Sequence, residues 1–535
     1  MPKHHAILLA IAAFVLFTAC PRPAAAFPFW LINGCPAVEA PDSETQNSSD
    51  VKRIDQIDSQ FSRFTDYANG FSILFPASME PDVSLSPVRV VLSDGRAKIE
   101  IYRDDLSGTA SDADDYLFYG RRFAANTRDH QVTEEATIEV AGLQTRVMKW
   151  TRRKLSRIEG DRNHYVSAEY VVSPRLVYTI FIKSDEPAAF ADTVLKSFQL
   201  VERRGMPRFS RRQKSSITPL NAAAQNFYDE FFGPDSALRW GIFEPSAPAS
   251  FNRLDALENF LSYSFPVILR YQMIDEALPV DELRAAYARG KYVELTLQTV
   301  HSDQVTASPL VYNGQDNESL VYDILDGLYD DYFNEYAQSL KAFGQPVLFR
   351  LDNEMNGDWC WYSAHYTAKD ADIYRELWRY IYRIFAKNGV TNAIWVWNPN
   401  DLSRPEFKWN HFLMYYPGDE YVDVIGLTGY NTGTYFPGER WREFAAIYDP
   451  LYCEYAELFD KPLMITEFGC SSFGGDKAAW IQQMFDHISQ YPRLKLAIWW
   501  SGTDYDAAGQ PARIYRLDET PEILDVFRRN LRHFP

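Results

Sequence analysis

The sequence predicts an α/β protein, a (β/α)8 TIM barrel preceded by a smaller α+β sandwich domain. Two observations lead to this fold class. At 535 residues the chain is too long for one ordinary domain. Its hydrophobic pattern also changes once, from alternating segments before about residue 200 to short apolar runs separated by amphipathic stretches after about residue 238. The change marks the boundary between the two domains.

The first residues predict export. Lys3 precedes an apolar stretch from Ala6 to Phe17, which is too short to span a bilayer but typical of a signal peptide, here residues 1–26. Phe17-Thr-Ala-Cys20 resembles a bacterial lipobox, which would make Cys20 a lipidated membrane anchor. Ala24-Ala-Ala26 offers an ordinary cleavage site instead. The lipobox is favoured, and the protein is expected to be a cell-envelope lipoprotein or secreted.

A polar tether (27–60) and a first domain (61–202) follow. The tether is rich in Ser, Asp and Glu, and helical stretches are expected near 113–124 and 186–196. Alternating segments predict a half-exposed antiparallel sheet, with strands near 71–75, 97–102, 146–150, 165–172 and 176–182. The opening Tyr67-Ala-Asn-Gly-Phe-Ser-Ile-Leu-Phe-Pro76 and the closing Val194-Leu-Lys-Ser-Phe-Gln-Leu200 resemble the ends of PsbP/Mog1-type domains. The segment contains no catalytic constellation, so a structural or binding module is expected.

A basic segment joins the two domains, at residues 203–222. Its charges are Arg203, Arg204, Arg208, Arg211, Arg212 and Lys214. A run of like charge is usually a solvated linker, and that interpretation is preferred over a site for an acidic partner.

The third part, residues 223–535, carries eight short apolar runs. They lie at 239–243, 266–270, 292–297, 347–350, 393–397, 422–427, 463–466 and 496–500. Helical periodicity separates several of them, for example at 322–342 and 371–387. Eight strand–helix units in about 300 residues match the size of a (β/α)8 barrel.

Two glutamates stand at the ends of these runs. Glu354 closes the fourth run in Arg350-Leu-Asp-Asn-Glu-Met-Asn-Gly357, and Glu467 closes the seventh in Leu463-Met-Ile-Thr-Glu-Phe-Gly469. The carboxyl ends of barrel strands form the active site in this fold. Two carboxylates there, one to donate a proton and one to attack, are what glycosidic bond cleavage requires. The alternative for either residue alone is a structural ion pair.

Four motifs resemble glycoside hydrolase family 26, which contains β-mannanases. They are Asn353-Glu-Met-Asn-Gly-Asp-Trp-Cys-Trp361, Trp395-Val-Trp-Asn-Pro-Asn400, Tyr416-Pro-Gly-Asp-Glu-Tyr-Val-Asp-Val-Ile-Gly426 and Ile465-Thr-Glu-Phe-Gly469. The resemblance implies that Glu354 is the acid/base and Glu467 the nucleophile of a retaining double displacement. It also implies that Tyr430 contacts the nucleophile.

Further substrate-binding residues are expected at the strand ends. Trp359, Trp361, Trp397 and Trp500 are candidate stacking platforms for sugar rings, and core packing is the alternative for each. Trp359 and Trp361 would also give Glu354 the apolar setting that raises an acid's pKa. Asn398 could bind a sugar hydroxyl or cap a loop. Arg270 and Arg350 would add charge to the site or form structural ion pairs.

Asn353 departs from the mannanase pattern. Mannanases of the family usually carry His directly before the acid/base, whereas most other families of the wider clan carry Asn, which holds the sugar 2-hydroxyl. That hydroxyl is axial in mannose and equatorial in glucose and xylose. Asn353 is therefore expected to bind substrate, and it makes β-glucan or xylan a competitor to mannan.

Composition limits the partners. A net charge of −18 argues against nucleic acid and is compatible with a neutral polysaccharide. No cofactor is expected, and the nine histidines show no H-x-x-x-H spacing, so no metal site is predicted. Cys35, Cys360, Cys453 and Cys470 are an even number in an oxidising compartment, with three connectivities open. A monomer is expected.

Together these features predict an exported retaining β-glycosidase acting on β-mannan or a related hemicellulose. Two alternatives remain at this stage. One is a non-catalytic carbohydrate-binding or envelope protein on a hydrolase barrel, and the other is a hydrolase of the cell's own exopolysaccharide. Endo or exo action is left open.

Overall fold

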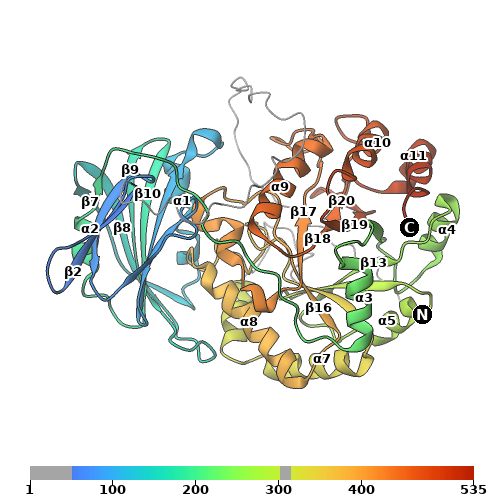
Figure 1. The fold of residues 1–535 in the computed structure, drawn as a ribbon, viewed down its shortest axis with the longest axis horizontal. Helices are drawn as coiled ribbons and strands as arrows, with labels where there is room; N and C mark the ends of the chain where they lie inside the picture. Colours follow the sequence, from blue (N-terminus) through green and yellow to red (C-terminus); the bar gives the residue numbers. More distant parts are fainter. Residues whose placement is uncertain (1–50, 302–314) are drawn as a thin grey trace.

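The computed structural model describes residues 51–301 and 315–535. The predicted signal peptide, Cys20, Cys35 and most of the tether lie outside the described residues. Figure 1 shows the described chain as two bodies in contact, a sheet-rich N-terminal domain in blue to cyan and a larger barrel in green to red. The predicted order of domains is thus the observed one.

The N-terminal domain contains two antiparallel sheets, one ordered β1-β2-β3-β11 and the other β4-β5-β6-β10-β9-β8-β7. The strands are β1 (Lys52–Gln56), β2 (Phe61–Asp66), β3 (Phe71–Pro76), β4 (Glu80–Asp82), β5 (Val90–Ser93), β6 (Ala97–Asp105), β7 (His130–Val140), β8 (Leu143–Arg152), β9 (His164–Ser173), β10 (Leu176–Ser184) and β11 (Gln199–Leu200). Two helices complete it, α1 (Ala113–Tyr119) and α2 (Ala191–Lys196). The five strands expected from alternation are present. Strand β1 lies inside the predicted tether and pairs with β2, so the ordered domain begins earlier than expected.

The second domain is a closed barrel of eight parallel strands in sequence order. They are β12 (Arg239–Phe243), β13 (Val267–Met273), β14 (Tyr292–Gln298), β15 (Val347–Leu351), β16 (Ala393–Trp397), β17 (Val424–Thr428), β18 (Leu463–Phe468) and β19 (Leu494–Trp500). Nearly every residue of these strands is buried, which explains why they appear in the sequence as continuous apolar runs. The predicted (β/α)8 fold is confirmed.

Helices surround the barrel. They are α3 (Ala222–Phe232), α4 (Asn252–Leu261), α5 (Val280–Tyr287), α6 (Gln315–Leu325), α7 (Asp330–Phe343), α8 (Ala371–Asn388), α9 (Phe444–Leu458), α10 (Lys477–Ile488) and α11 (Pro521–Leu531). A short hairpin, β20 (Thr503–Tyr505) with β21 (Pro511–Ile514), follows the last barrel strand. The single helix expected at 322–342 is two helices, because the chain turns between them at Gly327, whose φ is +89°.

Helix α8 shows how local sequence fixes an element next to the site. The Asp370 carboxylate accepts a hydrogen bond from the Asp372 N–H at 3.1 Å and caps the first turn. The helix ends at Gly389, which adopts the left-handed conformation (φ +75°). Between these residues one apolar face packs on the barrel, so α8 is held firmly at the carboxyl end of β15.

The basic segment between the domains lies against both of them. The Arg204 guanidinium covers the Tyr67 ring, 3.8 Å from its centroid, and Arg212 pairs with Asp460 at 2.5 Å on the barrel side. Gln213 and Phe459 form a parallel bridge. The Arg203 side chain also donates to the Ala68 carbonyl at 3.0 Å, so the segment contacts both domains through several of its charges.

Within residues 51–301 and 315–535, no helix is long and apolar enough to cross a membrane. The same residues contain no group of three or more His, Cys, Asp or Glu placed to hold a metal ion. Cys453 is disulfide-bonded, whereas Cys360 and Cys470 are buried free thiols. The latter two therefore do not take part in the pairing that an even cysteine count suggested.

Candidate active site

Glu354 lies at the start of the loop that joins β15 to α8. Its backbone is left-handed (φ +55°) and its N–H donates to the Asn398 carbonyl at 2.7 Å. The side chain is 6% exposed; Asn400 Nδ2 donates to Oε1 and the Trp359 indole N–H donates to Oε2 at 3.4 Å. Burial, reinforced by the negative charge of Glu467, raises the pKa of Glu354 to about 8. At neutral pH this carboxyl is a proton donor.

Glu467 occupies the carboxyl end of β18 in a different environment. Its Oε2 accepts a hydrogen bond from the Tyr271 hydroxyl and another from Arg350 Nη2 at 3.1 Å. The side chain is only 3% exposed. A guanidinium and a hydroxyl directed at one carboxylate oxygen stabilise its negative charge. Two buried carboxyl groups thus meet at the barrel mouth with opposite electrostatic surroundings.

Arg350 connects the two glutamates. It is fully buried on β15, and its Nη1 donates to Asn398 Oδ1 at 2.9 Å. The backbone carbonyl of the same Asn398 accepts the hydrogen bond from the Glu354 N–H. Its Nε lies 3.0 Å from Glu294, a buried carboxyl on β14. Burial raises the pKa of Glu294 to about 8, so the Arg350 charge is left chiefly to Glu467. The sequence left two roles for Arg350, charge in the site or a structural ion pair. The structure shows an ion pair that brings its charge to Glu467 in the site.

Arg270 does not reach the site. Its Nε pairs with Glu282 of α5 at 2.9 Å, and its Nη2 lies 3.7 Å from Glu276. Alternation along β13 explains this, because neighbouring residues of a strand face opposite sides. Arg270 faces the helices, whereas Tyr271 faces the barrel interior and contacts Glu467.

The structure places a second tyrosine at the predicted nucleophile, and the contact of Tyr430 with Glu467 stays a prediction. The hydroxyl that donates to Glu467 belongs to Tyr271, which the sequence analysis missed. Tyr430 is half-buried nearby, with its ring 5.0 Å from Tyr515 and 6.4 Å from Trp500. Burial and the charge of Glu467 raise the pKa of Tyr430 well above its usual value, so its hydroxyl stays protonated. Tyr430 lines the site beside Glu467 as a neutral group.

The two predicted asparagines are almost fully buried. Asn353 Oδ1 accepts a hydrogen bond from Gln298 Nε2 at 3.0 Å, and its carbonyl accepts one from the Tyr362 hydroxyl at 2.6 Å. Asn398 is bonded to Arg350 and to Thr428 Oγ1, at 3.0 Å from its Nδ2. Asn398 therefore orients Arg350, and a bond from Asn398 to a sugar hydroxyl stays a prediction.

The four candidate tryptophans divide into two groups. Trp359, Trp361 and Trp500 are half-buried; Trp359 bonds to Glu354, and Trp500 stacks on Phe243 with centroids 5.0 Å apart. Trp397 is fully buried and packed among Phe412, Tyr416 and Phe459. No sugar can stack on Trp397, because its ring points out of the barrel into the helical layer. Neighbouring side chains of β16 point to opposite sides of the strand, which places Trp397 on the helical side instead of in the barrel mouth.

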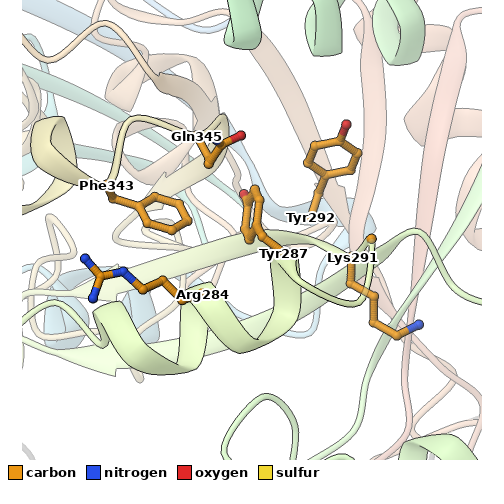
Figure 2. Close-up of a pocket in the computed structure, with 7 residues that line it drawn as sticks. Arg284, Tyr287, Lys291, Tyr292, Phe343 and Gln345 are labelled. Carbon is orange, nitrogen blue, oxygen red and sulfur yellow. The ribbon is translucent and has the colours of Figure 1, made fainter.

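A pocket of 510 Å³ lies elsewhere on the barrel (Figure 2). It is lined by Arg284, Tyr287, Gly290, Lys291, Tyr292, Phe343 and Gln345. These residues precede or begin strands β14 and β15, so the pocket opens at the amino end of the barrel. Features at that end usually concern stability. None of the predicted site residues lines this pocket.

A barrel with two such glutamates at the carboxyl ends of its fourth and seventh strands has the site architecture of a glycosidase. Comparison with known proteins agrees. Residues 300–491 match the model of glycosyl hydrolase family 26, a stretch that includes both glutamates. The family resemblance inferred from the four motifs is thus confirmed for this part of the chain.

The chain is similar to several curated enzymes. It is 32% identical over 231 residues to Endoglucanase H of Acetivibrio thermocellus, covering 42% of this chain and 23% of that protein. It is 32% identical over 212 residues to a mannan endo-1,4-beta-mannosidase of Bacillus subtilis, covering 38% and 50%. Among solved structures, a GH26 β-mannanase from Bacteroides ovatus shows 17% identity and a TM-score of 0.43, covering 58% and 93%. The chain spans half or less of the length of these two curated relatives.

Proposed function

We propose that the protein is an exported retaining β-glycosidase that hydrolyses a β-linked polysaccharide, with β-mannan or a related hemicellulose as substrate. The observation that supports this best is the contrast between the two glutamates. Glu354 is buried with a raised pKa of about 8, and Glu467 is held by Arg350 and Tyr271. Paired carboxyl groups whose environments differ in this way take the acid and nucleophile roles in glycoside hydrolysis.

The chemistry proceeds in two displacements. Glu467 attacks the anomeric carbon while protonated Glu354 gives its proton to the departing glycosidic oxygen, so a glycosyl ester forms and the C–O bond breaks. Glu354, now ionised, takes a proton from water, whose oxygen attacks the same carbon and releases Glu467. Two inversions return the original anomeric configuration. Proton NMR of the first-formed product tests this, and an inverted product would exclude the retaining mechanism.

A β-glucan is the second candidate substrate. Asn353 stands where family mannanases usually have His, and one relative of the chain is named an endoglucanase. Another relative of the chain is named a mannan endo-1,4-beta-mannosidase, which supports mannan. An equatorial and an axial 2-hydroxyl present different hydrogen-bond directions to residue 353, so substrate choice is a property of this position.

The deciding experiment is product analysis after incubation with mannan, glucomannan, mixed-linkage β-glucan and xylan. Glu467→Ala serves as the inactive control. Oligosaccharides from one polymer identify the substrate, and the size distribution separates endo from exo action. If the folded protein releases nothing from all four, the proposal fails for hemicelluloses. The cell's own exopolysaccharide and a non-catalytic binding role then become the leading functions.

Export is the remaining part of the proposal, and it is supported by the N-terminal apolar stretch and Cys20. The lipoprotein form predicts that metabolic labelling with a fatty acid tags the wild-type protein and not Cys20→Ala. Labelling of neither, with the protein found outside the cells, would support ordinary cleavage after Ala26. Retention of the full-length chain in the cytoplasm would contradict export.

A further inference from the structure

The loop that carries Glu354 contains unusual backbone at both of its ends. This loop, residues 352–370, joins β15 to α8. Six residues other than glycine adopt positive φ in the described part of the chain, and four of them lie in this loop. Asp352 and Glu354 stand at its start (φ +46° and +55°), and Ala368 and Lys369 at its end (φ +61° and +64°). Such conformations persist only where the surroundings impose them.

The barrel itself imposes the start of the loop. Asp352 accepts hydrogen bonds from the Thr299 N–H at 2.7 Å and from the Thr299 hydroxyl, and its own carbonyl accepts one from Tyr374 at 3.2 Å. Glu354 donates its N–H to Asn398. All these partners belong to the barrel domain.

The end of the loop is held by the N-terminal domain. Lys369 is 4% exposed, and its Nζ donates to Glu169 Oε1 at 2.6 Å and to Ser167 Oγ at 2.9 Å, both on β9. Asp370 accepts hydrogen bonds from Lys183 at 2.7 Å and from the Tyr165 hydroxyl at 2.9 Å. These are buried charge pairs and hydrogen bonds between domains, located within two residues of the strained backbone.

The middle of the loop also touches the N-terminal domain. Tyr119 at the end of α1 packs on His365, with centroids 5.7 Å apart, and the Arg122 guanidinium lies 5.5 Å from the centre of the Tyr366 ring. The Tyr366 ring is 4.6 Å from that of Trp361, and the Tyr366 hydroxyl donates to the Asp358 carbonyl at 2.6 Å. In Figure 1, α1 lies on the side of the N-terminal domain that faces the barrel. Contacts between the domains therefore extend along the loop toward Trp359 and Glu354.

We infer that the N-terminal domain positions the acid/base loop, acting through Lys369 and its buried partner Glu169. This inference rests on the proposed function, because it assigns the domain a task in that reaction. Without the pair, Ala368 and Lys369 can relax from the left-handed region, and the segment that carries Trp359 and Glu354 gains freedom. Proton donation then suffers, whereas Glu467, held by β13 and β15, does not. Lys369 is thus a positioning residue that makes no contact with substrate.

Two variants and one matched control test the inference in the full-length protein. Lys369→Met removes the charge from the loop, and Glu169→Gln removes it from the N-terminal domain while keeping the lysine. Arg157→Ala is the control, because Arg157 pairs with Asp330 of α7 at 2.7 Å and so joins the same two domains away from the loop. For each variant, kcat/KM is measured on the polysaccharide and on a dinitrophenyl β-glycoside of the same sugar.

The leaving group separates positioning from general damage. Dinitrophenolate departs without a proton, so its release needs Glu467 but not a well-placed Glu354. We expect Lys369→Met and Glu169→Gln to lower kcat/KM on polysaccharide by about 10- to 100-fold and to leave the dinitrophenyl substrate nearly unchanged. Arg157→Ala should leave both unchanged. Retained hydrolysis of the dinitrophenyl substrate also shows that the variant is folded.

Failure of the inference and of the proposed function look different. An inactive wild-type protein would overturn the proposed function. With an active wild type, two results overturn the positioning role. Either the variants keep the same kcat/KM values as Arg157→Ala, or their kcat/KM falls equally on the polysaccharide and on the dinitrophenyl substrate. If Lys369→Met does not fold, Glu169→Gln, which keeps every donor in place, decides the question alone.

Discussion

The two glutamates of this protein are the same residue type with different properties because of their immediate contacts. Glu354 accepts hydrogen bonds from the Asn400 amide and the Trp359 indole and is repelled by the second carboxylate. Glu467 accepts hydrogen bonds from the Arg350 guanidinium and the Tyr271 hydroxyl. Burial disfavours ionisation of the first, and donors compensate the charge of the second. Each role leads to a separate prediction for the corresponding variant.

Glu467→Ala should abolish turnover, because it removes the carboxylate that forms the glycosyl ester. Added azide should restore activity, since the small anion fills the vacated space and attacks from the same side. The product expected from NMR is a glycosyl azide of inverted configuration. Azide rescue of Glu354→Ala with the same inverted product would exchange the two roles.

The pH profile should report Glu354. Its pKa of about 8 lies above that of an ordinary carboxyl, so the proton-donating form is present below this pH and lost above it. We expect kcat/KM on polysaccharide to fall about tenfold per pH unit on the alkaline side of roughly pH 8. The fall should vanish for a dinitrophenyl glycoside, which needs no acid. If kcat/KM on polysaccharide already falls as the pH rises through 5, the assignment of Glu354 as the proton donor is contradicted.

At the scale of the element, the β15–α8 loop matters most. Gly357 follows Glu354 by three residues, and its N–H donates to the Glu354 carbonyl at 2.9 Å. A Cβ at this position would overlap the indole ring of Trp359. Because that indole donates a hydrogen bond to Glu354, a glycine at position 357 is required for Trp359 to pack beside the acid.

Gly357→Ala should therefore displace Trp359 and lower kcat on polysaccharide, by about tenfold or more since small misplacements at a reacting centre are costly. Gly108→Ala is the control, because a Cβ there meets no atom within 4 Å. Tryptophan fluorescence should change in the first variant and not in the second. Full activity of Gly357→Ala would show that the Trp359 contact is dispensable.

For the whole molecule, the contact between the domains is built from buried charges. Lys183, 2% exposed, lies within ion-pair distance of Glu100, Asp370 and Asp372. Burial opposes ionisation of Glu100 and Asp372, yet the neighbouring lysines hold the pKa of Glu100 at about 2 and that of Asp372 well below its usual value. Removing one partner from such a cluster leaves a buried charge uncompensated, which is strongly destabilising.

Lys183→Met should destabilise the protein by about 3–5 kcal/mol, since it leaves buried carboxylates without their partner. Arg96→Ala, which removes exposed pairs with Asp185 and Glu186, should destabilise the protein far less than Lys183→Met. Chemical denaturation of both variants measures the difference. Equal effects would show that the buried cluster adds nothing specific.

The sign of the pH dependence follows from the same lowered pKa values. A carboxyl whose pKa is lowered by folding adds stability above its unfolded pKa of about 4, and that stability is lost as the pH falls toward 2. Acid should thus weaken the wild type more than Lys183→Met.

The sequence alone determined the fold class of the second domain and the two glutamates. Eight apolar runs are visible because most positions of parallel strands buried on both faces are apolar, and each glutamate is visible because it stands at or just beyond the end of such a run. Cys360 and Cys470 have free thiols, which the sequence did not predict, because the number of cysteines does not tell which of them lie close enough to pair.

Only the tertiary structure decided which neighbours surround those glutamates. Tyr271 instead of Arg270 faces Glu467, and Trp397 faces the helical layer, because the pleat of a strand sends adjacent side chains to opposite sides. The role inferred for Lys369 depends on its ion pair with Glu169, which is 200 residues away in the sequence. The sequence determines which groups are present, and packing over long sequence distances determines which of them meet.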